Sequence, residues 1–413
     1  MTNFAGTNLD GESRPEGRDA GTGSRSDATA ATKSVPHDFL APVFAQYPIE
    51  VVSAEGVWLR NRIGERVLDM YGGHAVASLG YGHPGWTEAL TKQAQSCNFQ
   101  TNAVPMDVRV RAAERLVRFS KLDFTTVFFI NSGAEANENA MKLAFRMTGR
   151  PHIAAIEGSF HGRTAAAGAV TWGAAQKWYS FPRAPFDVSF IPRGDMTAIN
   201  EHVTDKTAAV IVEPVQGLAG AVDLGAPYLA ALRRRCDEVG AVLIFDEVQC
   251  GVGRTGYPFA ANMYEVMPDM ITTAKALGNG FPCAALLANE KISKTLKLDL
   301  LGTTFGGGPM ACAVMEAVIE AIESENLLER VRRVGEYIRN TCMVGPVKGH
   351  QGAGFLTGLR TSRPAKEIQA ELLECGILAG TSSDPNILRL LPAFILEEEH
   401  VDMLRDTLSD LPA

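Results

Sequence analysis

The feature that most constrains the fold of this 413-residue chain is a repeated order of short apolar segment, polar residue and helical pattern. Helical patterns, for example at 134–147 and 226–239, separate segments that are rich in strand-forming residues. Strands and helices that alternate at this spacing predict βαβ units, and therefore an α/β fold with a mostly parallel central sheet. The predicted strands are 127–130, 152–156, 188–191, 208–212, 241–245 and 270–273.

Changes in composition divide the chain into regions. Residues 1–34 are rich in Gly, Ser, Thr and charged residues and contain almost no large apolar side chain, so we expect a disordered tail. A transit peptide is the alternative for this stretch, but its acidic residues argue against that interpretation. Residues 35–75 contain a predicted hairpin with its turn near Gly64. Residues 76–309 are the expected large domain, and longer amphipathic helices predict a smaller α+β domain over 310–413.

Composition and charge exclude several classes of function. The formal net charge of −8 argues against a nucleic-acid-binding protein, which usually carries a basic excess on one face. No apolar run approaches the roughly 18 residues that span a bilayer. The seven cysteines are scattered and form no C-x-x-C pair, which disfavours a zinc site or a disulfide framework and fits a reducing cytoplasm. We therefore expect a cytoplasmic protein with no metal and no nucleic-acid or membrane partner.

Chemically active residues follow four of the predicted strands. Residues 131–134, Glu213, Asp246 and Lys275 each lie directly after a strand or within two residues of its end. Parallel strands end at one edge of a sheet, where α/β folds bind their ligands. Taken singly, each of these residues is better explained as a polar group at a strand end that caps the next helix. A carboxylate, a lysine and a glycine-flanked serine at the same edge together predict a site.

The residue types at this edge indicate an anionic ligand that reacts with an amine. Ser132, Gly133 and Ala134 begin a helix, and helix N-termini suit a phosphate, although a plain Ser N-cap is an equal alternative. Lys275 follows an apolar strand, where burial lowers the pKa of an amine and favours Schiff-base chemistry; an exposed lysine is the alternative. Asp246 ends an apolar strand and needs a cationic partner, which a protonated pyridine nitrogen provides.

Residues 251–256, Gly-Val-Gly-Arg-Thr-Gly, match the G-x-G-x-x-G pattern of dinucleotide-binding folds. Asp246 and Glu247 stand between the strand and this pattern, and no acidic residue ends a second strand about 20 residues later. We therefore favour a plain glycine-rich loop. An NAD-dependent oxidoreductase remains the alternative from a different class of enzyme.

Seven longer stretches carry a more specific signal. They are FFINSGAEANENAMKLA (128–144), SFHGRT (159–164), VEPVQG (212–217), LIFDEVQCGVGRTG (243–256), PDMITTAKALGNGFP (268–282), TTFGGGPMACA (303–313) and NILRLLP (386–392). In these stretches the sequence resembles the class III aminotransferases, and the resemblance covers residues 36–413. It implies pyridoxal 5′-phosphate (PLP) as cofactor and the type I fold of PLP enzymes. It also implies a large PLP-binding domain and a small domain that includes residues 35–75.

The resemblance implies a role for each residue at the strand ends. Lys275 would hold the cofactor covalently and then move the proton, and Asp246 would pair with the pyridinium nitrogen; these two are the expected catalytic residues. Gln249 would bond the 3′-oxygen of the ring. Thr304 would reach the phosphate of the neighbouring subunit, which implies a homodimer with shared active sites. The other expected cofactor-binding residues are Ser132, Gly133 and Ala134 at the phosphate, Phe160 and Val248 on the two ring faces, and His161 and Glu213.

The resemblance also implies the substrates, an amino acid and a 2-oxo acid. Arg163 would bind the α-carboxylate of the amino donor and Arg389 that of glutamate and 2-oxoglutarate, because a guanidinium binds a carboxylate through two parallel hydrogen bonds. A structural ion pair is the alternative for either arginine. We therefore expect transfer of the distal amino group of N-acetylornithine, or a similar ω-amino acid, to 2-oxoglutarate by a ping-pong mechanism.

Leu218 departs from the family pattern, because the family usually has a glutamate here that pairs with the arginine at position 389. Two further stretches depart from the family pattern: 306–308 reads Gly-Gly-Gly where the family has Gly-Gly-Asn, and 73–76 reads Gly-His-Ala-Val where it usually has Gly-Ile-Ala-Val near the substrate entrance. These three departures leave the donor open. Ornithine, 4-aminobutyrate, diaminobutyrate and alanine are alternative donors, and a PLP aminomutase is a further alternative.

Overall fold

The computed structural model describes residues 39–413. Val51–Ala413 form the larger compact unit of the chain. The tail predicted at 1–34 lies outside the described residues. Between residues 39 and 413, no helix combines the length and the apolar character needed to cross a bilayer.

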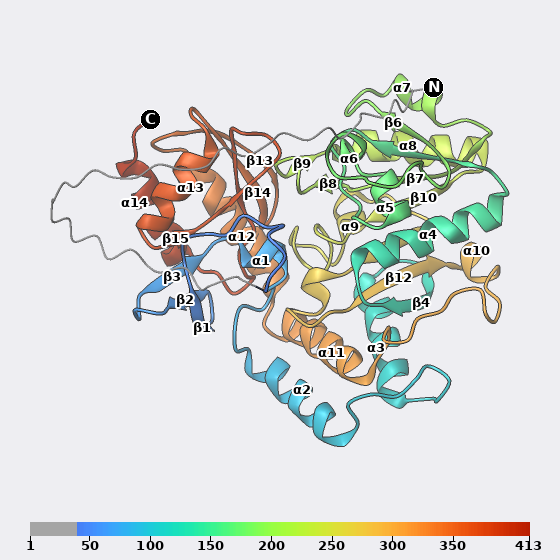
Figure 1. The fold of residues 1–413 in the computed structure, drawn as a ribbon, viewed down its shortest axis with the longest axis horizontal. Helices are drawn as coiled ribbons and strands as arrows, with labels where there is room; N and C mark the ends of the chain where they lie inside the picture. Colours follow the sequence, from blue (N-terminus) through green and yellow to red (C-terminus); the bar gives the residue numbers. More distant parts are fainter. Residues whose placement is uncertain (1–38) are drawn as a thin grey trace, which may run out of the picture. The chain divides into compact units, whose positions relative to one another are not determined.

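A seven-stranded sheet organises the larger unit (Figure 1). Six strands run in one direction, and β12 runs antiparallel to both of its neighbours. The predicted α/β fold with a mostly parallel sheet is therefore confirmed. In sheet order the strands are β4 (Phe124–Ile130), β12 (Ala284–Asn289), β11 (Met270–Thr273), β10 (Val242–Asp246), β7 (Thr207–Val212), β5 (His152–Ile156) and β6 (Asp187–Ile191).

The sequence did not predict β12, which reads Ala-Ala-Leu-Leu-Ala-Asn. Alanine and leucine are good helix formers and lack the β-branched side chains that mark the other strands. Residues 284–288 are nevertheless extended, because they pair with β4 on one side and β11 on the other and are buried. Pairing within the sheet therefore overrides the local preference of these residues.

Apolar clusters cover both faces of the sheet. Every residue of β10 is buried, and successive side chains point to opposite faces. Leu243 lies in the cluster that includes residues of α8 (Gly225–Val239), and its neighbour Ile244 lies in the cluster that includes residues of α4 (Gly133–Thr148). A strand that is buried on both faces reads as a continuous apolar run, which is why the sequence revealed it.

Two four-stranded sheets lie outside the central sheet. One joins β1, β2 and β3 to β15, so segments that are blue and red in Figure 1 share a sheet. The predicted hairpin with its turn near Gly64 is confirmed as β2 and β3. The strands of this sheet are β1 (Val51–Glu55), β2 (Trp58–Asn61), β3 (Arg66–Asp69) and β15 (Ile377–Leu378). The strands of the other sheet are β13 (Val347–Ala353), β14 (Leu356–Thr361), β17 (Ile387–Leu390) and β16 (Gly380–Thr381).

The longer helices expected after residue 309 are present. They are α11 (Pro309–Ser324) and α12 (Leu327–Thr341), and α11 packs against α2 (Pro84–Ser96) and α3 (Asp107–Ser120) as well as α12. The remaining elements are α1 (Gly72–Ala75), α5 (Ala165–Ala169), α6 (Ala174–Lys177), α7 (Ala198–His202), β8 (Val215–Gln216), β9 (Val222–Asp223), α9 (Ala260–Tyr264), η1 (Lys275–Leu277), α10 (Glu290–Ser293), α13 (Ala365–Glu374) and α14 (Glu398–Asp410).

Candidate active site

The strand-end residues lie at one edge of the central sheet. Strands β4, β7, β10 and β11 run in the same direction, so their carboxyl ends meet there. Asp246 and Glu213 are both buried, and the negative charge of each acts on the amine of Lys275. The fold therefore places two carboxylates and a lysine in one electrostatic environment.

Asp246 is held by three hydrogen bonds. Its Oδ1 accepts from the amide of Val248 at 3.0 Å, and its Oδ2 accepts from Asn137 Nδ2 and His161 Nδ1, both at 2.7 Å. A buried carboxylate needs such donors because it has left water. Each oxygen has two lone pairs, so an ionised Asp246 can also accept from a cationic ring nitrogen.

Asn137 is a site residue that the sequence analysis missed. Its Nδ2 donates to Asp246 and to the carbonyl of His161 at 2.8 Å, and its Oδ1 accepts from Thr272 Oγ1 at 2.6 Å. The available signal was an asparagine on the buried face of α4, next to alanines that face the core. Since a buried amide must satisfy its hydrogen bonds, such a position points to a polar partner across the helix interface.

His161 completes the support of Asp246. With Asp246 as acceptor, the imidazole carries its proton on Nδ1, and its buried Nε2 has no hydrogen-bond partner among the described residues. The amide of His161 donates to Thr171 Oγ1 at 2.9 Å, which fixes the backbone beside the ring. The structure thus brings together two residues that the resemblance assigned to the cofactor.

Lys275 begins η1, separated from the end of β11 by one residue, in a left-handed backbone conformation with φ of 45°. Burial lowers the pKa of its amine below the usual 10.5 and the positive charge of Arg389 acts in the same direction, whereas Asp246 and Glu213 oppose the shift. A lowered pKa increases the fraction of neutral, nucleophilic amine. Lys275 therefore has the electrostatic setting that the sequence analysis expected for it.

Glu213 links the strand end to the loop that carries Phe160. Its Oε1 accepts from the amide of Phe160 at 2.8 Å and its Oε2 accepts from the amide of Gly217 at 3.2 Å. Burial raises the pKa of Glu213 to about 7, and the charge of Asp246 adds to the effect, while His161 and the two amides oppose it. Glu213 acts in this structure by fixing two backbone segments around the site.

The N-terminus of α4 forms a cradle at the end of β4. Ser132 caps the helix by accepting from the amide of Glu135 at 3.2 Å, and the Glu135 carboxylate accepts from the Ser132 amide at 2.9 Å. A Cβ at Gly133 would lie 2.7 Å from both methyl carbons of Val248, so only glycine allows this approach. The amides of Gly133 and Ala134 belong to the first turn of α4. Amides in a first turn have no acceptor within the helix, so they can donate to a bound anion.

Gln249 and Val248 lie beside this cradle, in the loop after β10. Gln249 Nε2 donates to the carbonyl of His74 at 3.2 Å. A Cβ on Gly217 would lie 1.6 Å from Gln249 Oε1, so the glycine makes room for the amide side chain. This loop therefore brings a hydrogen-bonding side chain and an apolar side chain to the same edge.

The two arginines have different surroundings. Arg389 is buried, and it donates to the carbonyl of Thr381 at 2.6 Å, to the carbonyl of Gly217 at 3.0 Å and to the hydroxyl of Tyr71 at 3.1 Å. Arg163 is exposed and lies over the ring of Trp178, 4.7 Å from its centroid. Arg389 is therefore held in a fixed orientation, whereas Arg163 has a stacking contact that leaves its charge in solvent.

Leu218 is partly exposed, and its carbonyl accepts from the amide of Ser383 at 2.9 Å. Thr304 is exposed as well, and its neighbour Phe305 stacks on Phe99 with ring centroids 5.4 Å apart. Phe305 is 67% exposed. Thr304, which is one of the expected cofactor-binding residues, therefore lies next to exposed apolar side chains.

The glycine-rich loop 251–256 packs against protein. Cβ atoms at Gly251 and Gly256 would lie 2.6 Å from the carbonyl oxygen of Glu247 and 2.4 Å from Arg332 Cγ. Arg254 is fully buried and donates to the carbonyls of Phe355 and Pro392. These glycines accommodate neighbouring protein atoms, which supports the plain loop over a pyrophosphate-binding loop.

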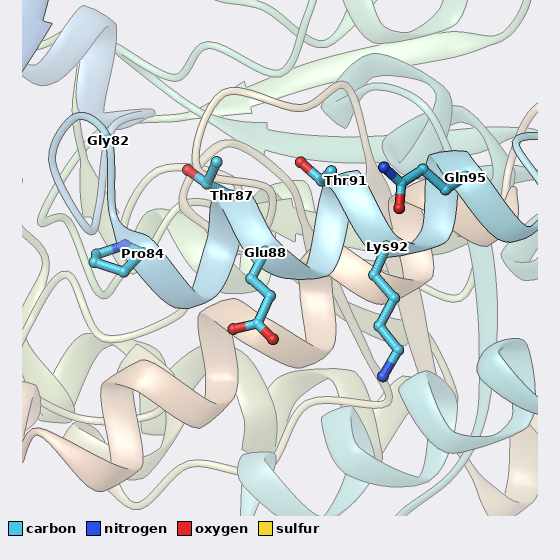
Figure 2. A pocket seen from close by; sticks show the side chains of 7 residues that line it. All are labelled: Gly82, Pro84, Thr87, Glu88, Thr91, Lys92 and Gln95. Atoms are coloured by element: carbon cyan, nitrogen blue, oxygen red, sulfur yellow. The ribbon is translucent and has the colours of Figure 1, made fainter.

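A separate hollow follows the outer side of α2 (Figure 2). Figure 2 shows Glu88 and Lys92, one turn apart, extending from the same side of the helix. No residue of the predicted site lines this hollow. The lining residues are Gly82, Pro84, Thr87, Glu88, Thr91, Lys92 and Gln95.

The residues at the sheet edge fit PLP. Asp246 is a buried carboxylate that suits a protonated ring nitrogen, Lys275 is an amine of lowered pKa that suits an aldehyde, and the cradle at Gly133 suits a phosphate. Three functional groups of the cofactor thus have partners of matching chemistry at one edge of the sheet, after the ends of β10, β11 and β4. This combination defines a site for amine chemistry.

Comparison with known proteins gives the same class. The family model of class III aminotransferases matches residues 40–411. The acetylornithine aminotransferase of Streptomyces coelicolor is 41% identical over 359 residues, which cover 86% of this chain and 88% of the relative. That of Methanocaldococcus jannaschii is 37% identical and covers 89% of this chain and 94% of the relative.

Solved structures extend the comparison to the fold. The ornithine aminotransferase of Toxoplasma gondii superposes with a TM-score of 0.83 at 26% identity, covering 90% of this chain and 91% of the other. The acetylornithine aminotransferase of Elizabethkingia anophelis gives 0.79 at 29% identity, covering 89% and 96%. The chain belongs to the class III aminotransferases. It is a PLP-dependent transaminase, and its fold is that of PLP enzymes of type I.

Proposed function

We propose that this enzyme transfers the distal amino group of N-acetylornithine, or of a similar ω-amino acid, to 2-oxoglutarate. The observation that supports this most strongly is the fixed orientation of Arg389 beside Lys275. Arg389 is held by two carbonyls and a hydroxyl, and its charge acts on Lys275. The names of the relatives, 35–41% identical acetylornithine aminotransferases, support the choice of donor.

Bound PLP supplies an aldehyde and an electron-accepting ring. Lys275 would bind the cofactor through its amine and, once released, would accept and return a proton at Nζ. Asp246 would keep the ring nitrogen protonated, because a buried carboxylate stabilises an adjacent positive charge. Asn137 and His161 hold Asp246 in place for this task. Ser132, Gly133 and Ala134 would hold the phosphate, and Phe160 and Val248 would contact the ring.

The two arginines account for substrate choice in this proposal. Arg389 binds the α-carboxylate of the oxo acid, and its fixed orientation reduces the entropy lost on binding. Arg163 binds the carboxylate of the ω-amino donor, so that the distal amine points at the cofactor. A glutamate at position 218 would form an ion pair with Arg389 that an incoming diacid has to break. Leu218 cannot form this ion pair, so a diacid binds Arg389 without that step.

We further propose a cytoplasmic homodimer. Thr304 and the exposed ring pair of Phe99 and Phe305 support shared active sites, since an apolar surface beside a cofactor residue suits a subunit interface. The seven cysteines are all free, in line with a reducing compartment. The pairing of β3 with β15 supports a small domain formed by residues 35–75 and 310–413, with 76–309 as the large domain.

A half-reaction screen tests the donor. The yellow enzyme is mixed with one amine at a time, and the visible absorbance of its lysine-bound cofactor is followed. We expect N-acetylornithine to bleach it and 2-oxoglutarate to restore it, and we expect the Lys275→Ala variant to show neither change. Bleaching by alanine or 4-aminobutyrate but not by N-acetylornithine would overturn the donor and keep the class.

A further inference from the structure

Residues 72–75 form a left-handed turn at the edge of the site. The φ angles of Gly72, Gly73, His74 and Ala75 are 54°, 55°, 65° and 68°. His74 and Ala75 carry a Cβ, and a residue other than glycine costs roughly 1–2 kcal/mol in this conformation. Such backbone persists only where its surroundings hold it, and it concentrates at functional sites.

The turn is held from several sides. Asp69 Oδ1 accepts from the amides of Tyr71 and Gly72, both at 2.8 Å, and Asp69 Oδ2 accepts from the hydroxyl of Tyr81 at 2.6 Å. A Cβ at Gly72 would lie 2.7 Å from the carbonyl oxygen of Leu391, so the backbone here approaches its neighbour closely. These contacts fix the direction in which the turn presents His74.

His74 lies between two parts of the site. Its carbonyl accepts from Gln249 Nε2 at 3.2 Å, and its Nδ1 lies 2.7 Å from the hydroxyl of Tyr71. The same hydroxyl accepts from Arg389 Nη2 at 3.1 Å. His74 is therefore connected to the predicted cofactor residue Gln249 through its backbone and to Arg389 through its side chain.

This chain of hydrogen bonds favours one position for the imidazole proton. A guanidinium only donates, so the Tyr71 oxygen accepts from Arg389, and the tyrosine hydroxyl can in turn donate to His74 Nδ1. Burial lowers the pKa of His74 below 6.5, and the charges of Arg389 and Lys275 add to the effect, which keeps the ring neutral. A neutral imidazole that accepts at Nδ1 carries its proton on Nε2.

We propose that His74 is a substrate-binding residue whose Nε2–H donates to a carboxylate oxygen of the dicarboxylic oxo acid bound at Arg389. The proposal deepens the proposed function and rests on it. Tyr71 is the positioning residue, because it orients His74 and Arg389 through one hydroxyl. His74 is partly buried but keeps exposed surface, so a ligand can reach the residue.

Binding of glutarate, a dicarboxylate without an oxo group, tests the proposal on the cofactor-loaded enzyme. By calorimetry we expect His74→Leu to raise the Kd of glutarate about tenfold or more, as expected for loss of a hydrogen bond to a charged group. His74→Gln, whose amide can still donate, should stay within about threefold of wild type, and the KM for 2-oxoglutarate should follow the same order with kcat little changed.

His350 on β13 is also an exposed histidine, and His350→Leu serves as the matched control that should bind glutarate like wild type. If His74→Leu binds glutarate as tightly as wild type and keeps its KM, the role of His74 is wrong while the proposed function stands. If the wild type neither binds glutarate nor passes an amine to 2-oxoglutarate, the proposed function fails, and the role of His74 fails with it.

Discussion

Asp246 depends on buried polar neighbours that lie far away in the sequence. Asn137 comes from α4, His161 from the loop after β5, and both reach the same carboxylate oxygen. Asn137 is itself fixed by Thr272 at the end of β11. A network of this kind orients its members more tightly than any single hydrogen bond, and removing one member leaves the others buried and unsatisfied.

We therefore expect Asn137→Ala to weaken cofactor binding and to lower the free energy of unfolding by about 1–3 kcal/mol, the cost of unsatisfied buried groups. Titration of the apoenzyme with PLP and urea unfolding measure the two effects. Asn139→Ala is the control from the same helix, because the Asn139 amide donates to the helix carbonyl of Glu135 and not to Asp246. Equal PLP affinity in the two variants would refute this role of Asn137.

Glu247 predicts a pH dependence of stability. Burial raises its pKa to about 8, the charge of Asp246 adds to this, and the amides of Ala261 and Ala260 oppose it. The folded state therefore retains this proton above the usual pKa of 4.5, while the unfolded state releases it. The stabilisation is complete below about pH 4.5 and is lost as the pH rises toward 8.

Glu247→Gln has no proton to lose, so its free energy of unfolding should fall less than that of wild type between about pH 5 and pH 8. Urea unfolding of the apoenzyme across this range measures the two slopes. Glu329→Gln, at an exposed position, should keep the wild-type slope. Parallel curves for wild type and Glu247→Gln would contradict the expectation.

The N-terminus of α4 shows how one element serves both the fold and the site. Its capping box, Ser132 with Glu135, starts the helix where β4 ends. The same turn leaves the amides of Gly133 and Ala134 at the edge where the ligand groups meet. Gly162 packs against Ala134, with a notional Cβ only 2.7 Å from that of Ala134, so the loop after β5 closes over the helix end.

Gly133→Ala should push this helix end away from Val248 and weaken PLP binding, because the new methyl group would lie 2.7 Å from both methyl carbons of Val248. The added variant Val248→Ala should recover part of the loss, which a double-mutant cycle of PLP affinities detects. Gly85→Ala in α2, where the new Cβ meets only ordinary contacts, is the control. Additive effects of the two changes would show that the contact is not the cause.

At the level of the assembly, the exposed aromatic surface beside Thr304 has a measurable consequence. Phe305 and Phe99 form a tilted ring pair and both are exposed in the single chain. Apolar surface of this kind lowers the free energy of association when a second subunit covers it. The surface lies next to the residue that the family resemblance assigns to a neighbouring subunit's phosphate.

We expect wild type to sediment as a dimer and Phe305→Asp to shift the species toward monomer, since a buried carboxylate without a partner opposes association. Analytical ultracentrifugation measures the species, and the transaminase rate should fall with the dimer fraction. Ile63→Asp is the matched control, because Ile63 is also 67% exposed but lies on the hairpin turn. A Phe305→Asp variant that stays dimeric would rule out this interface.

The sequence by itself determined the parallel strands and the groups at their ends, because β7 and β10 are buried on both faces and read as continuous apolar runs. It could not predict β12, whose Ala and Leu residues are extended only through pairing with β4 and β11.

The roles of Asn137 and Tyr71, and the hydrogen bonds of His74, likewise became visible only in three dimensions. Asn137 contacts Asp246 and Tyr71 contacts Arg389, and each pair is separated by more than one hundred residues in the chain. His74 is close in sequence to Tyr71 and is connected to Arg389 through it. Local pattern fixes which segments are strands and which residues end them, because those depend on burial and backbone preference. Tertiary structure determines which side chains form hydrogen bonds or interact through their charges. These interactions depend on the distances between segments that lie far apart in the sequence, and local sequence does not encode those distances.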